Sequence, residues 1–336
     1  MDVIKLSFCI PTYNRANFIG ETLDSIISQA TDEVEIIILD GGSTDNTEQV
    51  VSIYNNKFDR LKYYRQNFKG GIDRDLNKAI EMANGEYCWL MPDDDILKPN
   101  AIETILKEIK NNYSLIIVNG EMRNTDFSEV LEEKRLLFDN NKIYKPNDLS
   151  SLFIETVHYL TFTGAFVFKK NCWVEREKEE YYGSLFIEIG VVFQKTLPGN
   201  TLVIAEPLIV IRYGQGEWVQ KTFEVWMFKL PELIWGFPNF TESVKRQVCL
   251  KEPWRNLNEL IKLRALGAYS IDEYKKWLRP RISSKWYLFK SRFVAQFPGC
   301  IMNIITMLYI NLFHPNAKGL LLDLKNSQYY WKNYFR

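Results

Sequence analysis

Hydrophobic and polar residues alternate regularly along the first 120 positions of the chain. Short apolar runs, which predict buried strands, stand at residues 6–10, 35–39, 61–64 and 87–90. Stretches with an apolar residue every three or four positions, which predict helices, stand at residues 17–29, 47–54 and 72–83. Because alternating strands and helices form parallel sheets with helical crossovers, we expect an α/β chain with a doubly wound, mostly parallel central sheet.

Beyond residue 100 the pattern becomes less regular. A helix is expected at residues 101–110, and residues 121–160 are polar and weakly periodic. Further strands are expected at residues 115–118, 163–168, 201–205 and 208–212. Helices dominate from Trp218 onward, so we expect a sheet domain over residues 1–217 and a helical region over 218–336.

Composition excludes several classes of protein. With 46% hydrophobic and 25% charged residues, the 336-residue chain can bury a core and is not disordered. Its five cysteines are scattered without a C-x-x-C pair, and its two histidines, His158 and His314, are far apart. Disulfide scaffolds, zinc ribbons and histidine-rich metal sites are therefore not expected. The apolar run at residues 4–10 is interrupted and stopped by Pro11, so we expect no signal peptide and folding from the first residue.

Charge is distributed unevenly, although the whole chain has a net charge of zero. Residues 251–336 hold 15 Lys and Arg against 5 Asp and Glu, a net of +10, whereas the first 250 residues carry −10. Between Glu273 and Asp323 no acid occurs, and cations alternate with large aromatic residues, as in helices that lie on an anionic membrane surface. The apolar segment 300–313 is shorter than the roughly 20 residues of a spanning helix. We expect an interfacial anchor; a buried helix is the alternative, and nucleic-acid binding is not expected.

Candidate chemistry lies just after the predicted strands, where a doubly wound sheet binds its ligands. The first strand runs into PTYNR at residues 11–15, in which Tyr13 offers a flat ring for a nucleobase; a turn with a helix cap is the simpler interpretation. The second strand ends in Asp40, followed by two glycines. This carboxylate could accept hydrogen bonds from a base or ribose, or it could hold the turn that it begins. No glycine-rich dinucleotide motif follows the first strand, so a nicotinamide or flavin cofactor is not expected.

Three consecutive carboxylates, at residues 93–95, follow the fourth predicted strand. Like charges this close repel each other by roughly a kilocalorie per mole per pair in water, and a cation relieves the repulsion. Oxygen ligands in this small number suit Mg²⁺ or Mn²⁺ that is also bound by substrate phosphates. An acidic turn that caps the next helix is the alternative. Two glycines at residues 70–71 open another predicted helix, on which Arg74 could reach a diphosphate.

Taken together, these segments resemble the family 2 glycosyltransferases of the GT-A fold, which move a sugar from a nucleotide-sugar to an acceptor. The motifs that carry the resemblance are FCIPTYNR at residues 8–15, ILDGGSTDNT at 38–47, GGIDRDLN at 70–77 and ANGEYCWL at 83–90. Shorter motifs, among them IRYG at 211–214 and KEPW at 251–254, resemble the abequosyltransferase-type members that build bacterial O-antigen repeats. The resemblance implies a Rossmann-like sheet, with residues 1–120 on the nucleotide-sugar side and 121–217 on the acceptor side.

The resemblance also implies roles for individual residues. The residues expected at the donor nucleotide are Pro11, Thr12, Tyr13, Arg15, Asp40, Arg74 and Asp93. The family's Asp-x-Asp begins one residue earlier, where this chain has Pro92. Asp94 is therefore expected to bind Mg²⁺ or Mn²⁺, and Asp95 is the second choice.

An inverting transfer also needs a carboxylate that takes the proton from the acceptor hydroxyl. In the family this residue begins a helix in the second half of the domain, often as Glu-Asp. Glu188 stands at that place here, although the Asp is missing, and His158 and Glu180 are its rivals. The residues expected to close the acceptor side are Arg212, Tyr213 and Trp218, the last with a ring for sugar stacking or for core packing.

The expected function is that of an inverting, metal-dependent glycosyltransferase, peripheral on the cytosolic face of the inner membrane. It would extend a polyprenyl-diphosphate-linked saccharide of a bacterial surface polysaccharide. Two alternatives stay open. A sugar nucleotidyltransferase would share the sheet and the metal but should carry a glycine-rich loop after the first strand. A non-catalytic scaffold of the same fold would account for the missing Glu-Asp pair.

Overall fold

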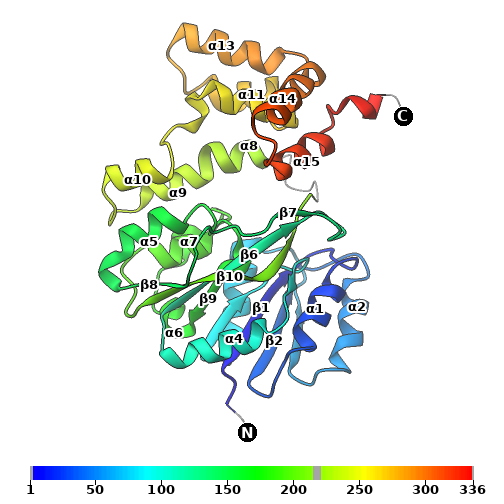
Figure 1. Cartoon of the computed structure of the whole chain (residues 1–336), viewed down its shortest axis with the longest axis vertical. Coiled ribbons are helices and arrows are strands. Elements are labelled where there is room, and N and C mark those ends of the chain that lie inside the picture. The colour runs from blue at the N-terminus through cyan, green and yellow to red at the C-terminus, as the bar shows by residue number, and fades with distance from the viewer. Residues whose placement is uncertain (1–2, 215–220, 335–336) are drawn as a thin grey trace. The chain divides into compact units, whose positions relative to one another are not determined.

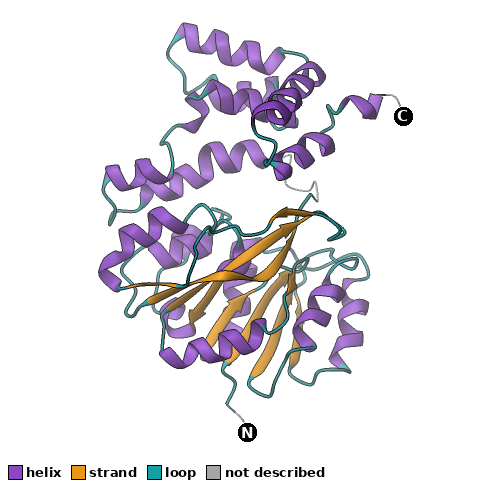
Figure 2. Cartoon of the chain, viewed as in Figure 1, coloured by secondary structure: helices purple, strands orange, loops and turns teal. Residues whose placement is uncertain are grey.

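The computed structural model describes residues 3–214 and 221–334 and divides the chain into two compact units. The sheet unit comprises Met1–Arg123, Glu133–Arg212 and Phe237–Val244. The helical unit comprises Asn124–Glu132, Tyr213–Gly236 and Lys245–Arg336. Figures 1 and 2 show the α/β arrangement of the first unit and the helices of the second.

The sheet unit is built on one central sheet. Its strands are β1 (Leu6–Thr12), β2 (Val34–Asp40), β3 (Leu61–Arg65), β4 (Tyr87–Leu90), β5 (Ile96–Leu97), β6 (Leu115–Arg123), β8 (Lys142–Tyr144), β9 (Phe166–Lys169) and β10 (Thr201–Arg212). Their order is β3-β2-β1-β4-β9-β6-β10-β5, and β8 also pairs with β10. The block from β3 to β4 is parallel, as is the pair β6 and β10, whereas β9 is antiparallel to both of its neighbours. The predicted α/β fold class is confirmed.

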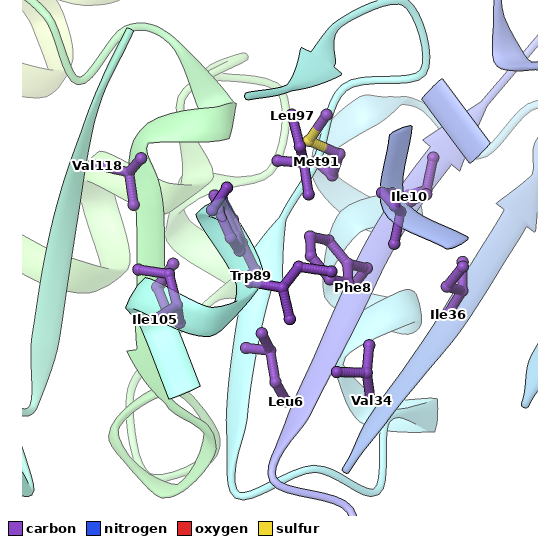
Figure 3. Close-up of a cluster of buried hydrophobic side chains, with 14 of the residues drawn as sticks. Leu6, Phe8, Ile10, Val34, Ile36, Trp89, Met91, Leu97, Ile105 and Val118 are labelled. Carbon is purple, nitrogen blue, oxygen red and sulfur yellow. The ribbon is translucent and has the colours of Figure 1, made fainter. Parts of the chain in front are cut away.

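Helices cover both faces of this sheet. They are α1 (Ile19–Ile27), α2 (Thr47–Asn55), α3 (Ile72–Met82), α4 (Ala101–Glu108), α5 (Leu149–Thr156), α6 (Lys170–Val174) and α7 (Ile187–Phe193). Apolar residues of α1, α2 and α4 join a cluster around the stacked rings of Phe8 and Trp89, whose centroids are 5.1 Å apart (Figure 3). Helix α3 packs against β1 and β2 and takes no part in that cluster. Because both faces are covered, the strand ends are where polar side chains can gather.

Two predicted elements differ in the structure. The strands expected at residues 201–205 and 208–212 are a single strand, β10, whose pairing with β6 shifts register around Pro207. A bulge of this kind lets a proline lie within a strand. The sequence pattern predicts a break between two strands at this position. The strand expected at residues 163–168 is shorter, because Thr163–Ala165 form a 3₁₀ turn before β9 begins.

The helical unit has its own apolar core. Its elements are β7 (Val130–Glu132), α8 (Thr222–Glu224), α9 (Leu230–Gly236), α11 (Leu257–Leu266), α12 (Ile271–Glu273), α13 (Lys285–Gln296), α14 (Gly299–Phe313) and α15 (Lys318–Asn326); α10 (Glu242–Val248) spans the boundary. The amide of Asn303 joins three helices by donating to Ala265 O at 3.1 Å and Leu324 O at 2.9 Å. Within the described ranges, no single helix is long and apolar enough to cross a membrane, and α13 and α14, bent by 94°, pass that test only as a pair.

Candidate active site

The acidic loop, residues 93–95, follows β4 beside the end of β1, because the two strands are parallel neighbours. Asp93 is buried, and the Nε atom of Arg15 lies 3.3 Å from its Oδ1. Burial raises the pKa of Asp93 to about 7; the charge of Asp94 adds to this effect and the charge of Arg15 opposes it. The strand end therefore holds a carboxyl group whose charged form is disfavoured by burial and by its neighbour Asp94.

Arg212, at the end of β10, holds the backbone of the acidic loop. Its N–H donates to Asp95 Oδ1 at 2.7 Å, and its Nε donates to Asp94 O at 2.8 Å. Its Nη2 lies 2.6 Å from a carboxylate oxygen of Glu21. Asp95 is buried, and burial together with the Asp94 charge raises its pKa well above the usual range. Asp94 is only half-buried and is the member of the triplet most open to a ligand.

Tyr213 and Trp218 are the other two residues expected to close the site. Tyr213 belongs to the helical unit, where its hydroxyl donates to Asp323 Oδ2 at 2.6 Å. Trp218 lies outside the described residues.

Asp40, at the end of β2, is fully buried and holds the turn that follows it. Its Oδ1 accepts hydrogen bonds from both the N–H and the hydroxyl of Ser43, each at 2.7 Å, and its Oδ2 accepts from the hydroxyl of Tyr63. Gly42 makes the turn possible because its φ of 83° lies in the left-handed region. A nucleotide would reach Asp40 only by displacing one of these donors or by using a remaining lone pair.

Asp75, in the first turn of α3, is a second buried carboxylate at these strand ends, and the sequence offered no role for it. Its Oδ1 accepts from Gln66 Nε2 at 2.6 Å. A Cβ atom on Gly70 would lie 2.6 Å from this oxygen, so only glycine admits the carboxylate there. Burial raises the pKa of Asp75, and the hydrogen bond from Gln66 opposes this shift. The signal that could have found it is an acid that follows two glycines at a helix start.

Two aromatic rings near the donor side are covered by cations. The Nζ atom of Lys69 lies 3.7 Å from the ring centroid of Tyr13, and the guanidinium carbon of Arg74 lies 4.2 Å from that of Tyr182. One face of the Tyr13 ring, which we expected to stack on a base, is therefore taken by an ammonium group.

Glu188 lies in the first turn of α7 and is only 2% exposed. The hydroxyl of Thr163 donates to its Oε1 at 3.1 Å. Burial raises the pKa of Glu188 to about 8, the charge of Asp73 adds to this effect, and the Thr163 hydrogen bond opposes it. The rivals His158 and Glu180 are exposed to solvent.

Asp73, another residue without a role in the sequence analysis, holds the segment that precedes Glu188. Its Oδ2 accepts from the N–H groups of Gly183 at 2.7 Å and Leu185 at 3.1 Å, and its Oδ1 accepts from Ile187 at 3.3 Å. Leu185 has a φ of 71°, which a bulky residue rarely adopts. The Asp73 carboxylate supports this conformation and thereby sets where α7 begins.

Arg176 holds the opposite end of α7. Its Nη1 donates to the carbonyls of Val191, Val192 and Lys195 at 2.9–3.0 Å, and its Nη2 donates to Thr196 O at 2.8 Å. A carboxylate before the helix and a guanidinium after it are both favourable for the helix dipole. The helix that carries Glu188 is therefore fixed at both ends by buried charged groups.

The Thr163–Ala165 turn connects Glu188 to the acidic loop. Gly164 O accepts from the indole N–H of Trp89 at 3.0 Å, and a Cβ on Gly164 would lie 3.1 Å from the Pro92 ring. Thr163, which contacts Glu188, and Pro92, which precedes Asp93, thus belong to neighbouring segments of the sheet unit.

The acidic loop is suited to a divalent cation that takes some of its ligands from the protein and the others from a substrate. Within the described ranges, no three His, Cys, Asp or Glu side chains are grouped closely enough to hold a metal by themselves. One or two oxygen ligands with open positions suit Mg²⁺ or Mn²⁺ bound to phosphates. Thr12 is buried beside this loop, and a hydrogen bond from its hydroxyl lowers the pKa of the Asp93 carboxyl. Phosphates of a substrate would supply the remaining ligands of the cation.

Comparison with known proteins identifies the class to which this arrangement belongs. Residues 7–173 match the model for glycosyl transferase family 2, so this part of the chain is a family 2 glycosyltransferase domain. It is 27% identical over 220 residues to the abequosyltransferase RfbV of Salmonella typhimurium, a match that covers 62% of this chain and 66% of that protein. It is 31% identical over 185 residues to the GalNAc(5)-diNAcBac-PP-undecaprenol β-1,3-glucosyltransferase of Campylobacter jejuni, covering 54% of this chain and 57% of that protein. No more than about two thirds of either relative is matched.

Solved structures agree with the fold. TarS of S. aureus (residues 1–349) has a TM-score of 0.58 at 16% identity, over 98% of this chain and 92% of that one. The mannosyltransferase PcManGT of Pyrobaculum calidifontis, solved with GDP-Man and Mn²⁺, has a TM-score of 0.53 at 15% identity, over 96% of this chain and 86% of that one. The expected GT-A fold is thereby confirmed.

Proposed function

We propose that this chain is an inverting glycosyltransferase that moves a sugar from a nucleotide-sugar to a polyprenyl-diphosphate-linked saccharide of a bacterial surface polysaccharide. The observation that carries the proposal is Glu188, a buried carboxyl group whose pKa is raised to about 8 and which the Thr163 turn connects to the acidic loop. The family 2 glycosyltransferase domain supports the reaction. The Campylobacter relative, named for an undecaprenol-linked acceptor, supports the acceptor class.

The donor side comprises the ends of β1, β2 and β4 and the first turn of α3. Thr12 and Tyr13, at the end of β1, would contact the nucleotide, the Tyr13 ring with the face opposite Lys69. Arg15 and Arg74 supply positive charge for the diphosphate. The residues that shape the wall behind them are Pro11, Asp40, Asp75 and Asp93. TarS solved with UDP and with UDP-GlcNAc, and PcManGT solved with GDP-Man, support a nucleoside-diphosphate sugar as the donor.

The acidic loop supplies the ligands for a metal ion. Asp94, with Asp93 beside it, would hold Mg²⁺ or Mn²⁺, which neutralises the negative charge that develops on a leaving diphosphate. Asp95 accepts a hydrogen bond from the backbone N–H of Arg212 and thereby stabilises the loop. Arg212 therefore acts as a positioning residue for the loop.

The chemical step belongs to Glu188. Its ionised carboxylate takes the proton from the acceptor hydroxyl while that oxygen forms a bond to the anomeric carbon of the sugar. The bond between this carbon and the diphosphate oxygen breaks, and its electron pair leaves with the nucleoside diphosphate. Attack opposite the leaving group inverts the anomeric configuration. A pKa near 8 makes Glu188 a stronger base than an exposed carboxylate while part of the population is still ionised at neutral pH.

The helical unit supports a place on the cytosolic face of the inner membrane. Large apolar side chains on α13 and α14 are exposed, among them Trp286 and Leu312, and basic residues accompany them. Exposed aromatic and aliphatic residues with flanking cations are typical of segments that lie in the interface of an anionic bilayer.

Nucleotide binding by the full chain tests the proposal. We expect one of UDP, GDP, CDP and dTDP to raise the melting temperature in the presence of Mn²⁺, by the equivalent of about 2.7 kcal/mol at 100 times its Kd. Asp94→Asn should abolish the Mn²⁺-dependent part and leave the unliganded melting temperature unchanged. A folded sample that responds to none of these nucleotides would favour the scaffold alternative. Turnover of a nucleoside triphosphate with a sugar phosphate would instead favour the nucleotidyltransferase.

A further inference from the structure

An apolar groove of about 320 Å³ lies in the helical unit between α11, α13 and α14, which lie together in Figure 1. Its walls include Leu257 and Ile261 of α11, Phe289 and Phe293 of α13, and Met302 and Ile305 of α14. The walls expose only apolar atoms to the groove, although Lys290 also lines it. Lys290 therefore contributes its hydrocarbon stem and keeps its ammonium group outside.

The groove opens to the surface rather than being closed by the core. Three of its wall residues, Phe289, Phe293 and Ile305, are 61%, 56% and 53% exposed. The exposed apolar surface continues along both helices at Trp286, Ile301, Leu308 and Leu312. Water-exposed apolar residues at this density mark a surface that is covered during function.

The charge around the groove is positive. No acidic residue occurs between Glu273 and Asp323, and α13 itself carries Lys285, Lys290 and Arg292. The acid on α11, Glu259, is paired with Lys262 at 2.5 Å. The Nζ atom of Lys290 lies 4.7 Å from the ring centroid of Trp286, at the edge of the groove. The ligand chemistry that complements this surface is a hydrocarbon with an anionic end.

Other occupants fit less well. Protein interfaces carry about one hydrogen bond per 100–200 Å², whereas the groove walls offer no polar atom to pair with. A second copy of this chain would bring its own Lys285, Lys290 and Arg292 against the same positive surface. A lipid chain needs no polar partner in the groove, and its phosphate is attracted by the cations.

We propose that this groove binds the isoprenoid chain of the lipid-linked acceptor, with the first phosphate held near Lys290. The proposal rests on the function proposed above, in which the acceptor is a polyprenyl diphosphate. The exposed face of α13 and α14 is sufficient for adsorption to a bilayer of ordinary lipids. A groove with walls from three helices adds a place for a single chain, which lets the enzyme select a scarce polyprenyl lipid from an excess of straight-chain lipids.

Binding of prenyl phosphates to the full chain tests this proposal. Geranyl, farnesyl and geranylgeranyl phosphate, which differ by one isoprene unit each, are titrated calorimetrically below their micelle concentrations, beside straight-chain alkyl phosphates of equal carbon number. We expect Kd to fall roughly tenfold with each unit until the groove is full, because every unit buries several apolar carbons. The straight-chain phosphates should bind at least threefold more weakly.

Two matched variants locate the site. Ile305→Trp puts a larger side chain into a wall of the groove. Leu308→Trp puts an equally large side chain on the same helix at a residue that is similarly exposed, 58% against 53% for Ile305, but does not line the groove. We expect Ile305→Trp to remove the dependence on chain length and to weaken geranylgeranyl phosphate at least tenfold, and Leu308→Trp to leave both unchanged. The nucleotide-dependent melting shift should be intact in both variants.

Several results would overturn the proposal. One is a Kd that does not depend on chain length, and another is an equal loss of geranylgeranyl phosphate affinity in both variants. Straight-chain phosphates that bind as tightly as prenyl phosphates would assign the groove to bulk lipid. A dimer in sedimentation velocity that Ile305→Trp alone dissociates would assign it to a second copy. A missing nucleotide shift beside intact prenyl binding would instead contradict the proposed function and leave the groove assignment standing.

Discussion

The sheet unit and the helical unit differ in how far their large apolar side chains are buried. In the sheet unit, the apolar residues of β1, β2 and β4 are buried by helices on both faces, and the side chains that collect at the strand ends are polar. In the helical unit, α13 and α14 leave large apolar side chains such as Phe293 and Leu312 exposed. Charge is also divided along the chain, with a net of −10 over residues 1–250 and +10 over residues 251–336. This difference supports the proposal that the sheet unit binds a polar ligand and that the helical unit contacts an apolar, anionic surface.

The largest effect is expected from Glu188→Gln. Removal of the base should lower kcat about 10³-fold, because a well-placed general base contributes 10² to 10⁴. Transfer of labelled sugar to a lipid acceptor measures this. The exposed Glu180→Gln is the matched control and should retain full activity. Equal activity of the two variants would remove Glu188 from the chemistry.

Glu188→Gln should also differ from the natural chain in how its stability depends on pH. The pKa of Glu188 is raised from 4.5 to about 8 in the folded state, so folding favours the protonated form. The natural chain should therefore lose stability as pH rises from about 4.5 to about 8, and Glu188→Gln should lose less over that window. Melting temperatures at pH 5 and pH 8 report the difference; a parallel loss in both proteins would contradict the burial of this carboxyl group.

The next effect is expected from Arg176→Ala in the sheet unit. The substitution leaves the four carbonyl groups at the end of α7 without their donor, and should lower the free energy of unfolding by about 3 kcal/mol. Arg279→Ala in the helical unit, where the side chain is exposed, should change it by less than about 0.5 kcal/mol. Urea denaturation measures both. Similar losses in free energy of unfolding would show that the burial and the four hydrogen bonds of Arg176 add nothing to its contribution to stability.

A smaller effect is expected from Leu312→Asn in the helical unit. The side chain is 74% exposed, so stability should not change, whereas partition onto anionic vesicles should weaken about tenfold, as for the loss of one buried leucine. Sedimentation with phosphatidylglycerol vesicles measures the partition. Ile36→Asn is the contrasting change, since this residue lies in the sealed core of the sheet unit and its substitution should prevent folding. Unchanged vesicle binding of Leu312→Asn would place the membrane contact elsewhere.

The smallest effect is expected from Asp73→Asn. Activity should rise with pH as Glu188 ionises, with a midpoint near 8 in kcat/KM. Burial is the main cause of the raised pKa and remains in the variant, whereas the negative charge of Asp73 is removed. The midpoint should therefore move down by less than one pH unit. A midpoint that stays in place while kcat falls would assign Asp73 to holding the 183–187 segment alone.

Local features of the chain account for the parts of the fold that could be predicted. The strands β1, β2 and β4 are short, mainly apolar runs, and the helices between them have apolar residues at helical spacing. The continuous strand β10 could not be predicted, because Glu206 and Pro207 interrupt its pattern and only pairing with β6 carries the chain through the bulge. The 3₁₀ turn at Thr163–Ala165 could not be predicted, because it leads directly into the apolar strand β9 and no break in the sequence separates the two.

The site divides in the same way. The sequence by itself determined that acidic residues follow a buried strand, that Asp40 ends another, and that the basic residues gather near the C-terminus, because all of these are local patterns. Only the tertiary structure decided that Asp95 is bound to Arg212, that Asp73 holds a segment 110 residues further along, and that Glu188 is buried while Glu180 is exposed. Burial, hydrogen bonding and pKa depend on which distant segments surround a side chain, and that information arises only when the chain folds.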